Sequence, residues 1–177
     1  MTEQNRTVFN REHLKTTKLY LNIMTNEERI QRAVQLFKSG YNCSQAVVAA
    51  YADLYGFTEE QAFRMAASFG GGIGRMRQTC GAACGLFLLA GLETGAVDGA
   101  DQKGKAHNYE VVQALAEQFR QENGSIICAE LLGLSKQSPT PHEPEARTTE
   151  YYQKRPCAMM VETAARLFAK FLEEQKQ

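Results

Sequence analysis

The chain has 177 residues, a length that suits one domain with an ordinary hydrophobic core. Its 20 Lys and Arg residues balance 20 Asp and Glu residues, and this zero formal charge argues against broad electrostatic binding of nucleic acid. The longest strongly apolar run, "LFLLAGL" at 86–92, is far shorter than the ~20 residues of a membrane-spanning helix. Because the N-terminus also shows no apolar signal segment, we expect a cytoplasmic protein without membrane insertion.

Helical signals recur along the whole chain. Thr25 with Glu28, and Thr58 with Gln61, have the spacing of capping boxes, and Asn42 is a further N-cap residue. Apolar residues follow these caps at helical spacing, and no run shows the sustained alternation of a strand. The predicted helices are, in chain order, 26–38, 43–55, 59–69, 80–92, 102–122, 126–132 and 157–174.

The predicted helix 80–92 is apolar nearly all round, so we expect it at the centre of the fold. Residues 133–150 contain three prolines and are typical of an extended surface loop. Residues 1–24 are polar and weakly periodic, and we interpret them as an arm ahead of a single domain, 25–177. The predicted fold class is therefore all-α: a compact single domain of about six to seven helices around a central apolar helix.

Four of the five cysteines (Cys43, Cys80, Cys128 and Cys157) fall in the first turn of a predicted helix. A helix N-terminus carries roughly half a positive charge and unpaired N–H donors, and both favour a thiolate. We therefore predict that the four helix starts converge on one site that holds sulfur anions. The alternative is that these cysteines pack as small apolar side chains. Packing is the interpretation we prefer for Cys84, which lies among small apolar residues.

The stretch "FGGGIGRMRQTCGAACG" is rich in glycine, but it contains neither the dinucleotide-binding fingerprint nor the phosphate-binding loop. The glycines let the backbone turn sharply and approach whatever Cys80 holds, so Gly72 and Gly74 are candidate cofactor-binding residues. Arg75 and Arg77 add positive charge near that sulfur. Arg75 joins the candidate site on this ground, although both side chains also fit the description of solvated loop charges.

The cysteine motifs together resemble a known family. The segments are "GYNCSQAV" around Cys43, "CGAACG" beginning at Cys80, "SIICAELLG" around Cys128 and "KRPCAMMV" around Cys157. This pattern resembles the C-GCAxxG-C-C family, whose members are described as redox-active, although the order of Cys and Gly in "CGAACG" departs from the family name. The resemblance covers roughly 27–172 and implies a small helical protein in redox chemistry. The pattern is also similar to a domain of split-Soret-type cytochromes, which carry an iron–sulfur centre.

Three functions follow as hypotheses. In the first, all four cysteines bind an iron–sulfur cluster for electron transfer, with a structural zinc site as the variant. This hypothesis is favoured because four separated thiols need a common centre to explain them. In the second, the chain is a metal-free thiol–disulfide protein that uses Cys43 with Cys80, or Cys80 with Cys84. In the third, it is a non-catalytic helical binding module. Covalent haem is not expected, because C-x-x-C-H is absent. Enzymatic activity, the redox partner and a homo-oligomeric site stay open.

Overall fold

The computed structural model describes residues 24–135 and 138–176. Within these ranges it contains eight α-helices, two 3-10 helices and no β-strand, which confirms the predicted all-α class. The predicted arm, 1–24, lies outside the described residues except for Met24, and the boundary of the domain stays a prediction. The helices are α2 (Asn26–Lys38), α3 (Cys43–Ala49), η1 (Ala52–Tyr55), α4 (Glu59–Ala66), η2 (Ala67–Phe69), α5 (Gly81–Thr94), α6 (Gln102–Asn123), α7 (Cys128–Leu131), α8 (Thr149–Lys154) and α9 (Cys157–Glu174).

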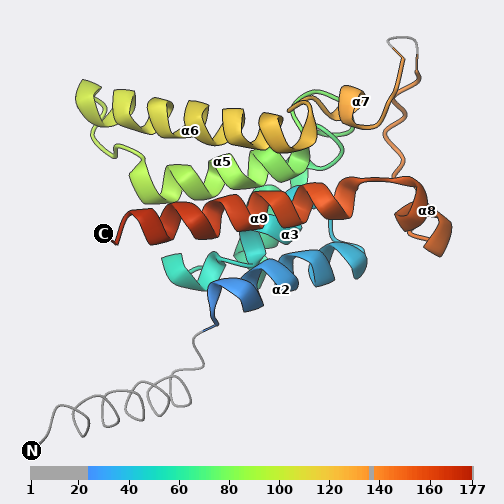
Figure 1. Cartoon of the computed structure of the whole chain (residues 1–177), viewed down its shortest axis with the longest axis horizontal. Coiled ribbons are helices and arrows are strands. Elements are labelled where there is room, and N and C mark those ends of the chain that lie inside the picture. The colour runs from blue at the N-terminus through green and yellow to red at the C-terminus, as the bar shows by residue number, and fades with distance from the viewer. Residues whose placement is uncertain (1–23, 136–137, 177) are drawn as a thin grey trace, which may run out of the picture.

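Helix α5 has the central position that its composition predicts. It contacts α3, α6 and α9, and α6, α5 and α9 run side by side in Figure 1. Helix α9 also packs on α2, while α3 contacts α2, α4, α5 and α9. The first six residues of α5 are all buried, as an all-round apolar helix requires.

Glycine allows α3 and α5 to approach closely. A Cβ atom added at Gly85 would lie 2.9 Å from the Val47 Cβ and 3.1 Å from the Ser44 carbonyl oxygen. A Cβ atom added at Gly81 would lie 3.3 Å from the Cys43 Cβ. Because no larger residue fits without a shift, these two glycines bring the N-termini of α3 and α5 together.

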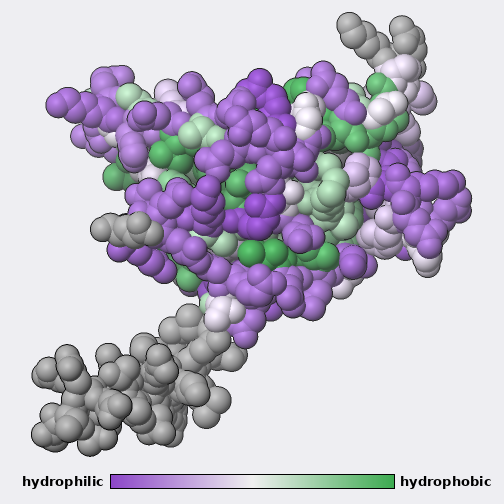
Figure 2. Space-filling model, viewed as in Figure 1, coloured by the Kyte–Doolittle hydropathy of each residue, from purple (hydrophilic) through white to green (hydrophobic). Residues whose placement is uncertain are grey.

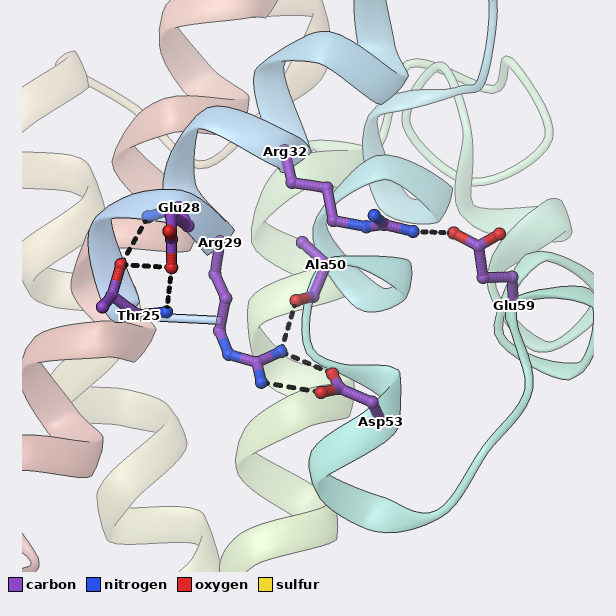
Figure 3. Close-up of polar contacts among 7 residues, drawn as sticks. All are labelled: Thr25, Glu28, Arg29, Arg32, Ala50, Asp53 and Glu59. Carbon is purple, nitrogen blue, oxygen red and sulfur yellow. Dashed lines mark hydrogen bonds and ion pairs between the residues drawn. The ribbon is translucent and has the colours of Figure 1, made fainter. Parts of the chain in front are cut away.

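A buried arginine fixes α2 to the segment after α3 (Figure 3). Arg29 is 1 % exposed, and its guanidinium donates to the Ala50 carbonyl at 2.9 Å and to the Asp53 carboxylate at 2.5 and 2.7 Å. It also lies over the Tyr51 ring, 5.6 Å from the centroid. The predicted capping box of Thr25 with Glu28, drawn in the same view, starts α2.

Several elements differ from the prediction. The helix expected over 59–69 ends at Ala66 and continues as η2, and the helix expected over 126–132 is the shorter α7, Cys128–Leu131. The helix expected over 43–55 ends at Ala49 and continues as a turn and η1. The break lets the buried Tyr51 point at α9, where its hydroxyl donates to the Ala165 carbonyl at 2.8 Å. Helix α8 was not predicted, since it follows the proline-rich segment; Thr148 caps it by accepting from the Tyr151 N–H.

The surface seen in Figure 2 is mostly hydrophilic, with small separate apolar patches. The large apolar side chains that stay exposed come from different parts of the chain: Leu54, Met76, Leu92, Val97, Tyr109 and Met159. Among the described helices, none combines the length and the apolarity needed to cross a membrane.

Candidate functional site

Four cysteines line one cavity of about 280 Å³. Cys43, Cys128 and Cys157 are the first residues of α3, α7 and α9, and Cys80 is the N-cap of α5. The loop before α5, α7 and the start of α9 gather at one end of the bundle, on the right in Figure 1. The structure thus brings together the four helix starts singled out from the sequence, and all four thiols are free.

Backbone hydrogen bonds join the starts of α5 and α7. The Cys80 N–H donates to the Ile126 carbonyl at 2.7 Å, and the Cys128 N–H donates to the Gln78 carbonyl at 2.7 Å. These reciprocal bonds form an isolated antiparallel bridge between the two segments. Two cysteines that are far apart in sequence are therefore held next to one another by main-chain contacts alone.

The glycine-rich loop is a left-handed turn. Every residue from 71 to 75 has a φ between 56° and 74°, and for Ile73 and Arg75 this conformation is strained. Gly72 lies against α7, because a Cβ atom there would be 2.5 Å from the Cys128 Cβ. Gly74 and Arg75 line the cavity. The turn therefore serves to bring backbone and guanidinium groups to the thiols.

Cys157 has the most acidic thiol of the site. A hydrogen bond between Cys43 and Cys157 lowers the pKa of Cys157 to about 7 and raises the pKa of Cys43 well above its usual value. Burial opposes the lowering at Cys157, while the charges of Arg155, Arg147 and Arg77 add to it. Near neutral pH a large fraction of Cys157 is therefore thiolate, whereas Cys43 keeps its proton.

Burial has the opposite effect on the other two cavity thiols. It raises the pKa of Cys80 to about 12, even though the N–H groups of Ala82 and Ala83 face the sulfur. It also raises the pKa of Cys128, against a hydrogen bond from Arg77. The expectation that a helix start favours a thiolate therefore fails for Cys80, because desolvation outweighs the helix N-terminus.

Cys84 is buried on α5 and its thiol lies 3.7 Å from the Thr79 carbonyl. Burial raises its pKa to about 11. It is not among the described residues that line the cavity. These contacts are compatible with the predicted packing role.

Four arginines line the cavity beside the thiols: Arg75, Arg77, Arg147 and Arg155. The carboxylate of Glu145 pairs with three of them: it lies 3.6 Å from Arg75, 3.9 Å from Arg77 and 2.5 Å from Arg155. Arg155 was detectable in the sequence as the basic residue two positions before Cys157. Arg147 had no such signal, because the loop that carries it reaches the cavity only in the folded chain.

Arg147 lies between aromatic rings at the cavity wall. Its guanidinium is 4.8 Å from the centroid of Phe37 and 4.6 Å from that of Tyr151. It donates to the Tyr41 carbonyl at 3.5 Å, and among the described residues no carboxylate pairs with it. The charge is therefore held by ring faces rather than by an anion.

The described residues do not form a preassembled metal site. No three side chains of His, Cys, Asp or Glu there are arranged so that they could hold one. Four thiols are nevertheless the donor set that an iron–sulfur cluster uses, and they line one cavity. The cluster and the zinc variant stay predictions.

Comparison with known proteins agrees with the cysteine pattern. No curated protein and no solved structure matches the chain. A family model matches residues 41–171, which include all four cavity cysteines, and its description is "Putative redox-active protein (C_GCAxxG_C_C)". The match spans more than half of the chain and confirms the resemblance found from the motifs. The chain therefore belongs to the C_GCAxxG_C_C family.

Proposed function

We propose that the chain carries out thiol–disulfide exchange with Cys157 as the attacking thiolate and Cys43 as the resolving thiol. The observation that carries this proposal is that the Cys43 and Cys157 thiols line the same arginine-rich cavity and interact with one another there. A thiolate at neutral pH next to a protonated partner is the arrangement that exchange requires. Cys157 takes the role that the sequence offered to Cys80, because the pKa of Cys80 is raised to about 12.

The exchange proceeds in two displacements. The Cys157 thiolate attacks one sulfur of a substrate disulfide, the substrate S–S bond breaks, and the other substrate sulfur leaves as a thiolate that takes up a proton. Cys43 then loses its proton and attacks the Cys157 sulfur of the mixed disulfide, which releases the second substrate thiol. The substrate gains two electrons, the chain is left with a Cys43–Cys157 disulfide, and an external thiol reductant restores both thiols.

An iron–sulfur cluster is the second candidate. The observation in its favour is that four thiols line the cavity, whereas exchange needs two. Cys43, Cys80, Cys128 and Cys157 would hold the cluster, and the arginines would offset the negative charge of its thiolates. Bound there, it would supply one-electron transfer. The redox partner, cytoplasmic location and oligomeric state stay predictions under either candidate.

The first prediction tests the thiol pair with a neutral disulfide, dithiodipyridine. Cys157→Ser slows exchange at pH 7 by at least about tenfold, because the remaining cavity thiols are mostly protonated. Cys84→Ala, which removes a buried thiol outside the cavity, leaves the rate near that of the unsubstituted chain. Stopped-flow absorbance measures the rates, and mass spectrometry after oxidation locates the Cys43–Cys157 disulfide.

Anaerobic purification separates the two candidates. Iron and acid-labile sulfide in stoichiometric amounts, with broad visible absorption that Cys157→Ser removes, would replace exchange by electron transfer as the function. Equal rates for Cys157→Ser and Cys84→Ala in metal-free protein would contradict the assignment of Cys157 as the attacking residue.

A further inference from the structure

We propose that the cavity binds a small acidic molecule: a low-molecular-weight thiol compound, or its disulfide, that carries carboxylate or phosphate groups. This names the substrate class of the thiol pair and rests on the proposed function. The observations behind it are the charge of the cavity wall, two arginines with unpaired nitrogen atoms and the size of the cavity.

The cavity wall carries a large excess of positive charge. Its described lining includes four arginines and no Asp or Glu. Glu145, outside that lining, is shared by three of the four guanidinium groups, so one negative charge faces three positive ones. A thiolate at Cys157 offsets one more charge. At least two guanidinium charges are left for a ligand, and their forked donors suit carboxylate and phosphate oxygens.

Two of these arginines also keep unpaired donors. Arg77 is 9 % exposed, and its Nε has no hydrogen-bond partner among the described residues. The buried Nη1 of Arg147 lacks one as well within those ranges. Buried guanidinium groups are ordinarily paired, since desolvation without a partner is costly. Arg77 and Arg147 come from different segments and line the same cavity, which points to one anionic occupant between them.

The cavity volume favours a small molecule. About 280 Å³ is just below the ~300–1,000 Å³ range of small-molecule pockets. Cys157 lines the same cavity as the arginines, and the charges of Arg147 and Arg77 reach its sulfur. A ligand that pairs its acidic groups with Arg77 and Arg147 is therefore held beside the attacking sulfur, where binding raises the effective concentration of its disulfide.

The test compares two disulfides of similar chemistry and different charge. Dithiobis(nitrobenzoate) carries two carboxylates, whereas dithiodipyridine is neutral. The rate constant of the reduced chain with dithiobis(nitrobenzoate) is divided by its rate constant with dithiodipyridine. This quotient, divided by the same quotient measured for a neutral small thiol, should be at least about ten. Arg147→Gln should lower this quotient several-fold and Arg147→Lys should retain most of it. Arg64→Gln, a change at an exposed arginine on α4, should leave it unchanged.

A second measurement does not depend on thiol chemistry. In Cys157→Ser, citrate at constant ionic strength should raise the unfolding temperature by about 3 °C relative to chloride, and Cys157→Ser combined with Arg147→Gln should lose this shift. Reaction with the neutral disulfide but no anion preference and no citrate shift would overturn the acidic-ligand inference alone. A citrate shift without reaction toward either disulfide would overturn the exchange function and keep the anion site. Absence of both the disulfide reaction and the citrate shift would overturn both the exchange function and the anion site.

Discussion

Cys157 and Cys80 stand at equivalent places, each at the start of a long helix, yet their thiols differ in chemistry. Cys157 is partly exposed, hydrogen-bonded to Cys43 and close to Arg155, so its pKa falls to about 7. Cys80 is 6 % exposed, and burial raises its pKa to about 12. Local position therefore identifies the candidate thiols, and their tertiary surroundings set the pKa of each.

The residue-scale prediction is a pH profile. Alkylation of Cys157 by iodoacetamide should rise with pH around a midpoint near 7, because the thiolate is the reacting form and its pKa is about 7. Cys80, with a pKa of about 12, should stay nearly unmodified up to pH 9. Peptide mass spectrometry after timed quenching measures both rates in one sample. A midpoint near 9 for Cys157 would mean that neither the Cys43 thiol nor the neighbouring guanidinium groups stabilise its thiolate.

The sequence alone predicts the cysteines of the site but not all of its arginines. The four cysteines carry a local signal, since each falls in the first turn of a predicted helix, and all four do line the cavity. Arg147 carries none: its place depends on how the loop before α8 folds back over Phe37 and Tyr151. Long-range contacts of this kind have no periodicity or spacing that a single sequence reveals.

At the scale of elements, the predicted helices agree with the structure where local signals are strong and differ where a distant contact intervenes. The capping boxes start α2 and α4 where they were expected. Helix α3 ends early because Tyr51 hydrogen-bonds to α9 at Ala165. A contact with an element more than a hundred residues away overrides local helix propensity.

The element-scale prediction concerns the contact between α3 and α5. Gly85→Ala should lower the free energy of unfolding by about 1–3 kcal/mol, because the new methyl group overlaps Val47 and the Ser44 carbonyl. Gly91→Ala is the matched control on the same helix: nothing lies within 4 Å of its added Cβ, so it should stabilise by about 0.5–1 kcal/mol. Urea unfolding measures both. If the two variants are equally stable, the helices are not packed as closely as described.

At the scale of the whole molecule, α9 joins the parts of the fold. It packs on α2, α3, α5 and α6, and its first residue is Cys157. A disulfide from Cys157 to Cys43 would therefore connect α9 covalently to α3. If the proposed disulfide forms, the redox state of the site would be coupled to the stability of the whole domain through this connection.

The whole-molecule prediction follows from that coupling. The oxidised chain should unfold at a higher temperature than the reduced chain, because the disulfide closes a loop of about 115 residues, worth up to ~4–5 kcal/mol in the chain-entropy estimate. Calorimetry with and without reductant measures the difference, and Cys43→Ala should abolish it. An oxidised form that unfolds more easily than the reduced one would show that the two helices cannot accept the bond in their native positions.

The position of Cys157 at the start of α9 also has a consequence for biosynthesis. Cys43, Cys80 and Cys128 leave the ribosome first, and until α9 has been translated and has docked, the cavity lacks both the reactive sulfur and Arg155. Domains form as units while the chain is being made, so a nascent chain carries only ordinary, mostly protonated thiols. The proposed reactivity of Cys157 would therefore arise only once α9 has docked and the cavity around the four thiols is complete.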